Sequence, residues 1–268
     1  MSDQHKRIEK SIELDATPEE VWEAVATGEG MACWFVPHRF DPPEGGVGAR
    51  VVSDFGSGNV SEATVREWEP GRRYASSADG DPQVVEFLVE GRDGGGAVLR
   101  LIHSGITGED WEAEYHSRGW DGFLSNLRRY FDHFRGLPPA TVSIIAFSDL
   151  DKDGIWSLFN DALGIDRQLA VGDTVHLTPE GLEPIDGVVV VAEPGNLGIR
   201  SDRGVHFFSG DGAWGMVTVT HYYYGEGLDR DALTAGWQRW TDSLFPPSAD
   251  PTEPGEGGSP QEPGPPAD

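Results

Sequence analysis

The sequence predicts an α+β protein made of two tandem copies of one fold, each a curved antiparallel sheet around a long C-terminal helix. Three observations lead to this prediction: an internal repeat, a series of short strand patterns separated by glycine turns, and an apolar helical pattern that closes each copy. The 268 residues, with a 37% hydrophobic share and nine tryptophans, are sufficient for substantial cores.

The internal repeat is visible as two short matches with one spacing. Residues 47–51 (VGARV) match residues 171–175 (VGDTV), and residues 69–71 (EPG) match residues 193–195, in both cases 124 positions later. Further matches keep the same order, and their offsets fall from 134 to 117 along the chain: Val21-Trp22 with Ile155-Trp156, Asp93-Gly94 with Asp211-Gly212, His103 with His221, and Gly119-Trp120 with Gly236-Trp237. A falling offset predicts that the second copy is shorter and has lost loops.

Each element of the first copy has its own sequence signal. Residues 8–14 alternate and predict an edge strand, and residues 17–20 (TPEE) predict a helix start with an N-cap, a proline at the first position and a capping box. The apolar spacing from Trp120 to Phe134 predicts a helix of about five turns. Strand patterns occupy the region between, near 47–54, 59–68, 72–78, 83–91 and 97–104, with a hairpin turn at 93–96. The second copy repeats the closing helix with Leu233, Trp237, Trp240 and Leu244.

Composition divides the chain into residues 1–136, 137–245 and 246–268. The first two parts are the predicted copies, with a linker expected at 136–140 because two prolines interrupt the long helical pattern there. The third part is rich in proline, glycine and acids, and we expect it to be a disordered tail.

The charge and the hydropathy of the chain argue against a nucleic-acid partner and against membrane insertion. Its 46 acids and 20 bases give a net charge of −26, distributed over all three parts, so we expect no nucleic-acid partner. No apolar stretch is long enough to span a membrane and the N-terminus lacks a signal-peptide pattern, so we expect no membrane insertion and a cytoplasmic location.

Three motifs of the first copy resemble the START-like SRPBCC superfamily, in particular its branch named for the activator of heat-shock protein 90 ATPase. The motifs are TPEEVW at 17–22, CWFVP at 33–37, and Gly119-Trp120 followed by Leu124 and Leu127. The resemblance spans residues 5–135, whereas the second copy has nothing that corresponds to residues 34–37. It implies a helix-grip fold with a cavity between sheet and helix, in which members bind lipids, sterols, polyketides or other apolar small molecules.

The resemblance also predicts which residues line that cavity: Trp34, Phe35, Phe87, Leu101, His103, Trp120 and Leu124. We expect non-enzymatic binding of an apolar small molecule, with no catalytic residue, metal or cofactor. One alternative is a chaperone-associated module that acts on a heat-shock ATPase. The other is a cyclase- or hydrolase-like enzyme in the same cavity, which would need an acid/base pair that the sequence does not reveal.

Several further residues admit two interpretations. Residues 149–154 (DLDKDG) match the first half of a calcium loop, but Asn160 stands where the bidentate glutamate belongs, and Asp151 aligns with the N-cap of the first copy. Glu112 and His116 have metal-ligand spacing, but an acidic helix start explains them as well.

Several histidine, tyrosine and arginine residues can likewise be interpreted as either functional or structural. His103 and His221 occupy equivalent late-strand positions, where each is either a polar group facing a cavity or a histidine hydrogen-bonded at a sheet edge. The run 222–224 (YYY) predicts a strand packed on both faces between the copies, with a ligand role as the alternative. We expect Arg128-Arg129 to be solvated and Cys33 to fill the core.

Overall fold

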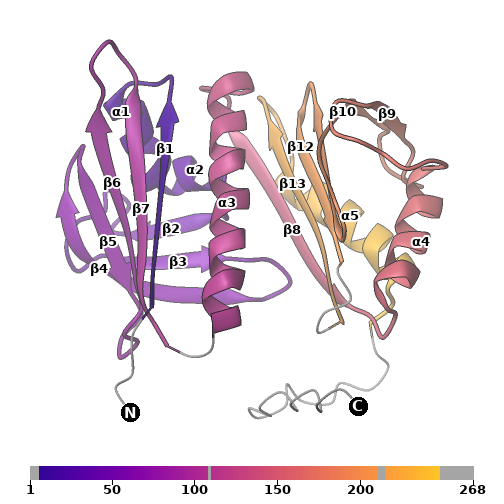
Figure 1. Ribbon diagram of the computed structural model, residues 1–268, viewed down its shortest axis with the longest axis horizontal. Helices are drawn as coiled ribbons and strands as arrows, with labels where there is room; N and C mark the ends of the chain where they lie inside the picture. The colour runs from indigo at the N-terminus through magenta and orange to yellow at the C-terminus, as the bar shows by residue number, and fades with distance from the viewer. Residues whose placement is uncertain (1–5, 108–109, 211–214, 248–268) are drawn as a thin grey trace, which may run out of the picture.

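The computed structural model describes residues 6–107, 110–210 and 215–247 (Figure 1), so most of the predicted tail lies outside the described residues. Within these residues the first copy contains a seven-stranded antiparallel sheet in the order β1-β7-β6-β5-β4-β3-β2. Its elements are β1 (Lys6–Leu14), α1 (Pro18–Ala26), α2 (Gly28–Ala32), β2 (His38–Asp41), β3 (Arg50–Asp54), β4 (Val60–Glu69), β5 (Arg73–Ser77), β6 (Val84–Gly91), β7 (Ala97–Ile106) and α3 (Asp110–His133).

The second copy repeats this arrangement in fewer residues. Its described part forms a six-stranded antiparallel sheet in the order β8-β13-β12-β11-β10-β9. In both copies the first strand pairs with the last, and the other strands follow in reverse chain order, so the predicted edge strand at 8–14 is confirmed as β1. The elements are β8 (Pro139–Phe147), α4 (Lys152–Leu163), β9 (Thr174–Leu177), β10 (Ile185–Glu193), β11 (Asn196–Ser201), β12 (Gly204–Ser209), β13 (Met216–Tyr224) and α5 (Arg230–Leu244).

The 124-residue offset is a structural equivalence. The amide of Gly48 donates to the carbonyl of Val65, and the amide of Gly172 donates to the carbonyl of Val189, each at 2.9 Å. The strand ladder then shifts register immediately after Val65 in β4 and after Val189 in β10, so both copies carry a β-bulge at the same point. The repeat predicted from sequence is therefore two copies of one topology.

Helix starts follow the predicted capping rules. Thr17 accepts from the amide of Glu20 and the Glu20 carboxylate accepts from the amide of Thr17, with Pro18 at the first position of α1. At the equivalent point Asp151 accepts from the amide of Gly154 at 2.8 Å and caps α4. The helical interpretation of residues 149–154 is therefore confirmed.

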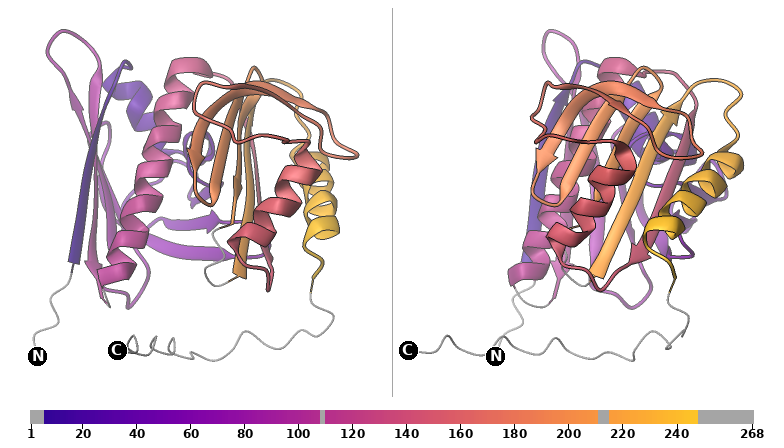
Figure 2. Two further views of the ribbon diagram at one scale, coloured as in Figure 1. Left: turned by 45° about the vertical axis from the view of Figure 1, so that its right-hand side comes forward. Right: turned by 90° about the vertical axis from the view of Figure 1, so that its right-hand side faces the viewer.

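The elements stack in four layers, with α3 between the two sheets (Figure 1). Helices α4 and α5 cover the face of the second sheet that points away from α3 (Figure 2). Strand β13 is packed on both faces as predicted: Tyr222 and Tyr224 join the core of the first copy, and Tyr223 joins that of the second. The Tyr224 ring stacks on Phe134 near the end of α3, with ring centroids 4.3 Å apart.

The contact between the copies is centred on the chain that follows α2. Here the second copy supplies hydroxyl groups to backbone carbonyls of the first. The hydroxyls of Tyr222 and Tyr224 come from β13 and that of Thr141 from β8, and Tyr222 is paired with Thr141 in the sheet. The bonds run from Thr141 to the carbonyl of Ala32 (2.5 Å), from Tyr224 to that of Cys33 (2.6 Å) and from Tyr222 to that of Phe35 (2.7 Å).

Three sequence expectations need correction. The sequence analysis missed the short elements α2 and β2, which have no counterpart in the described part of the second copy. Strand β8 begins at Pro139, within the linker expected at 136–140, because a proline is tolerated at the start of an edge strand. Arg129 is half-buried and donates to the carbonyl of Val190 at 3.5 Å, since the face of α3 expected to be solvated is covered by the second sheet.

The hydroxyl contacts predict a stability effect. In a Tyr224→Phe variant the ring stack on Phe134 is retained, but the buried carbonyl of Cys33 loses its donor. We expect the free energy of unfolding, measured by urea titration, to fall by about 1–3 kcal/mol. Tyr115→Phe is the matched control, because its ring is 44% exposed, and should change stability by less than about 0.5 kcal/mol. Equal stability of the two variants would contradict the role assigned to the Tyr224 hydroxyl.

Candidate functional site

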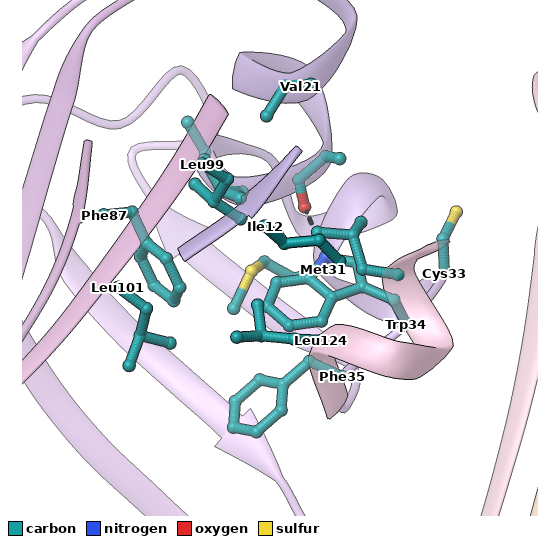
Figure 3. Close-up of a cluster of buried hydrophobic side chains, with 14 of the residues drawn as sticks. Ile12, Val21, Met31, Cys33, Trp34, Phe35, Phe87, Leu99, Leu101 and Leu124 are labelled. Atoms are coloured by element: carbon teal, nitrogen blue, oxygen red, sulfur yellow. Dashed lines mark hydrogen bonds between the residues drawn. The ribbon is translucent and has the colours of Figure 1, made fainter. Parts of the chain in front are cut away.

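The seven residues predicted to line a cavity are all buried between the first sheet and α3. Figure 3 shows five of them, Trp34, Phe35, Phe87, Leu101 and Leu124, in one cluster. Each is buried, with exposed fractions from 0% to 8%, and they come from four segments that are distant in sequence. Trp34 and Phe35 follow α2, Phe87 lies in β6, Leu101 and His103 lie in β7, and Trp120 and Leu124 lie in α3.

Strand and helix periodicity explain this convergence. Phe87 and Leu101 are register partners across β6 and β7, so their side chains leave the sheet on one face, and His103 follows on that face two residues later. Trp120 and Leu124 are four residues apart on α3 and so point the same way, toward the sheet.

Aromatic rings make direct contact within the site. Phe35 and Trp120 are stacked with ring centroids 5.3 Å apart, and Phe87 meets Trp120 edge to face at 6.2 Å. The indole N–H of Trp34 donates to the carbonyl of Ala24 in α1 at 2.9 Å, shown by the dashed line in Figure 3. The site is therefore an aromatic interior whose walls are fixed by backbone hydrogen bonds.

His103 is the polar centre of this interior, and its hydrogen bonds define its tautomer. The indole nitrogen of Trp120 can only donate, so the His103 Nδ1 at 3.2 Å accepts. The proton of the neutral ring is then on Nε2, which donates to the Gln83 side-chain oxygen at 2.9 Å. Burial, together with the nearby His116, lowers the pKa of His103 to about 4, so the ring is neutral at pH 7.

His103 does not lie at a sheet edge, which was one of the two interpretations of its sequence position. Strand β7 lies between β1 and β6, so the ring is covered by α3 and the sheet continues on both sides. His116 belongs to the same surroundings, with its ring centroid 5.1 Å from that of His103. The sequence analysis missed the partner of the ring, Gln83, because a loop glutamine twenty residues upstream carries no sequence signal for this contact.

The second copy places a histidine at the equivalent position. His221 lies in β13 beneath α5, where its ring centroid is 3.9 Å from that of Trp237, and its cross-strand partner is His206. The Nδ1 atoms of the two histidines are 3.1 Å apart, and the hydroxyl of Ser201 contacts the His206 Nε2 at 2.9 Å. Burial lowers the pKa of His206 to about 3 and that of His221 well below its usual value, so both rings are neutral.

The other candidate residues have structural roles. Glu112 and His116 lie in the first two turns of α3, which begins at Asp110 as an acidic helix start. Among the described residues, no group of three or more His, Cys, Asp or Glu side chains is placed to hold a metal ion. Cys33 is buried, and desolvation raises the pKa of its thiol to about 12, which is typical of a core cysteine.

A second positioning residue that the sequence analysis missed is Asn126. It is 1% exposed on the apolar face of α3, and its amide donates to the carbonyl of Trp34 at 3.0 Å. Its signal was a polar side chain between Leu124 and Leu127 in an otherwise apolar helix face. Together with Tyr222 and Tyr224, it fixes the segment that carries Trp34 and Phe35.

Strand order, helix placement and buried interior define the class: a START-like helix-grip protein with two tandem copies. The family described as Activator of Hsp90 ATPase homolog 1-like protein matches residues 15–132, from just before α1 to the end of α3. This match lies within the first copy and confirms the resemblance found in the sequence. The family match and the fold together support a module of the ligand-binding or Hsp90-ATPase-activator type.

Solved structures similar to the chain cover either about half of it or most of it. Protein BH1534 of Bacillus halodurans is 25% identical over 47% of this chain and 96% of its own, with a TM-score of 0.42. Protein MLL2253 of Mesorhizobium loti is 21% identical over 47% of this chain and 97% of its own, with a TM-score of 0.42. DynU16, a protein of the dynemicin biosynthetic locus, is 19% identical over 91% of this chain and 98% of its own, with a TM-score of 0.43. No curated protein matches the chain.

None of the helices in the described part of the chain has the length and apolar character of a membrane span.

The buried neutral histidines predict how stability depends on pH. His103 and His206 titrate near 6.5 when unfolded, but burial lowers their pKa to about 4 and about 3 in the fold. As the pH falls, these histidines therefore bind protons in the unfolded chain at a higher pH than in the folded protein. The stabilisation is complete above pH 6.5 and declines toward pH 4, by roughly 1 kcal/mol per pH unit for each histidine.

Urea unfolding of the wild type and a His103→Gln variant at several pH values between 7.5 and 4.5 measures this effect. Subtracting the free energy of unfolding of the variant from that of the wild type at each pH removes the contribution of the many carboxylates, which the two proteins share. We expect the stability of the variant to fall less steeply over this interval, and parallel curves would contradict the neutral state of His103.

Proposed function

We propose that the protein binds an apolar small molecule, without catalysis, between the sheet and α3 of its first copy. The observation that carries this proposal is the convergence of seven buried side chains, six apolar and one neutral histidine, on one interior region. Predominantly apolar walls with a few placed polar groups are typical of small-molecule sites. The family of the first copy is consistent with a ligand-binding module.

His103 supplies the polar contact for such a ligand. Its Nε2–H now donates to Gln83, a half-buried residue of the loop before β6. A carbonyl or hydroxyl oxygen of a ligand can replace the Gln83 oxygen as the acceptor of this hydrogen bond. The proposed ligand is therefore a largely apolar molecule with one oxygen atom near Nε2.

The same histidine supports binding in preference to acid–base catalysis. A general acid or base that works near neutral pH needs a pKa close to 7, whereas that of His103 is lowered to about 4. Both ring nitrogens are also engaged, Nδ1 by Trp120 and Nε2 by Gln83. No carboxylate side chain of the described residues forms a hydrogen bond with this ring.

The second copy supports the backbone of the proposed site. The hydroxyls of Tyr222 and Tyr224 hold the carbonyls of Phe35 and Cys33, so the chain between them cannot move freely. A wall that is already ordered loses little conformational entropy when a ligand binds. In this proposal the second copy is a rigid support for the binding site of the first.

Native mass spectrometry of the freshly isolated full chain tests for a bound molecule directly. We expect an excess mass that is retained under gentle conditions and lost on denaturation, with one molecule per chain. Titration with N-phenyl-1-naphthylamine, a neutral apolar fluorophore that the net charge of −26 does not repel, measures the empty site. Absence of both the excess mass and saturable dye binding would disprove the proposal.

A matched pair of variants locates the binding. Leu124→Gln places a polar group in the interior, and we expect it to weaken dye binding at least tenfold because the apolar wall is interrupted. Leu137→Gln makes the same change at a position that is 41% exposed and should leave binding within about twofold. Circular dichroism confirms that both variants are folded, and equal affinities would place the bound dye elsewhere.

A further inference from the structure

The second copy contains a hollow of about 490 Å³, which is within the range of small-molecule sites. It lies between α4, the loop at 165–169 and the turn that joins β10 to β11. Because α4 covers the face of the second sheet that points away from α3, the hollow is separate from the site proposed in the first copy (Figure 2).

The equivalent place in the first copy is filled by aromatic side chains. Trp68 of β4 meets Trp22 of α1 edge to face with ring centroids 5.1 Å apart, and its cross-strand partner Tyr74 is at 5.6 Å. The ring also lies over Gly45, where an added Cβ would be 2.5 Å from it. Phe40, from β2, closes the cluster at 6.1 Å.

The repeat identifies what replaces these rings in the second copy. The 124-residue offset, fixed by the shared β-bulge, places Ala192 at the position of Trp68. The cross-strand partner of Ala192 is Leu197, where the first copy has Tyr74. Trp156 is retained at the position of Trp22, and all three residues line the hollow. The second copy also has no counterpart of β2, and so none of Phe40.

We propose that this hollow is a binding site for a planar heteroaromatic molecule of one or two fused rings, which occupies the space that the indole of Trp68 fills in the first copy. The apolar part of the lining, which includes Trp156, Ala192 and Leu197, leaves the space that an aromatic ring fills in the first copy, and such a space accommodates an aromatic molecule of matching size. The lining also includes the charged residues Lys152, Asp153, Arg167 and Glu193. Trp156 provides the ring contact, and its indole N–H is already bonded to the carbonyl of Gly210 at 2.9 Å, which fixes its orientation.

Polar side chains on the lining explain why a heteroatom fits. Asn160, Gln168 and Asn196 contribute amide groups around the hollow, and an amide can both donate and accept. The Asn196 oxygen accepts from the hydroxyl of Ser209 at 2.9 Å, which fixes that amide and leaves its NH₂ group as a donor. A ring nitrogen or hydroxyl group of the ligand can pair with these groups, whereas a pure hydrocarbon cannot.

Titration of the full chain with 5-fluoroindole, followed by ¹⁹F NMR, tests this site. We expect one saturable site in the wild type and at least a tenfold loss of affinity in Ala192→Trp, because the introduced indole fills the hollow as Trp68 does. Val171→Trp adds the same side chain at a position that is 67% exposed and should leave affinity within twofold. Ala192→Leu should give an intermediate loss.

The reciprocal variant is Trp68→Ala, which opens the equivalent space in the first copy and should raise the stoichiometry from one to two. If this variant does not fold, the graded series at Ala192 still decides the question. Leu124→Gln should leave fluoroindole binding unchanged, so failure of this site and failure of the site in the first copy are distinguishable. Absence of saturable binding, or equal affinity in the wild type and Ala192→Trp, would overturn the proposal.

Discussion

The arrangement of this protein depends on five consecutive backbone carbonyls between the two copies, those of residues 32–36, which begin at the last residue of α2. A buried carbonyl without a donor is costly, and here every one is paired with a side chain. Three donors come from the second copy, one from α3 and one from the adjacent His38. The segment that carries Trp34 and Phe35 is consequently held by both copies, and β8 and β13 of the second copy supply three of its five donors.

The two copies retain one framework and differ in how its interior is used. Both keep the β-bulge, the capped first helix and a buried histidine beneath a tryptophan of the last helix. They differ where the first helix meets the meander, because Trp68 and Tyr74 fill the first copy whereas Ala192 and Leu197 leave a hollow in the second. Divergence after duplication has thus changed side-chain volume while the strand ladder, which depends on the backbone, has remained.

Both copies bury histidines that are neutral at pH 7. His103 keeps one proton and uses it as a hydrogen-bond donor, because Trp120 occupies its other nitrogen. In the second copy His206 and His221 lie side by side and are buried more deeply, so both stay uncharged. An interior with neutral polar groups and aromatic walls is suited to recognising uncharged molecules, and the surface charge of −26 stays outside it.

The resemblance to a known family pointed to seven residues that lie in the interior of the first copy. The sequence by itself determined the tandem α+β architecture and the helix starts, because these depend on local periodicity, capping and repeated spacing. It placed Tyr222 and Tyr224 on one strand face for the same reason. Only the tertiary structure decided that Arg129 is covered, that Gln83 pairs with His103 and that Ala192 opens a hollow. These depend on which surfaces meet across long sequence separations, and neither composition nor period-two and period-3.6 patterns carry that information.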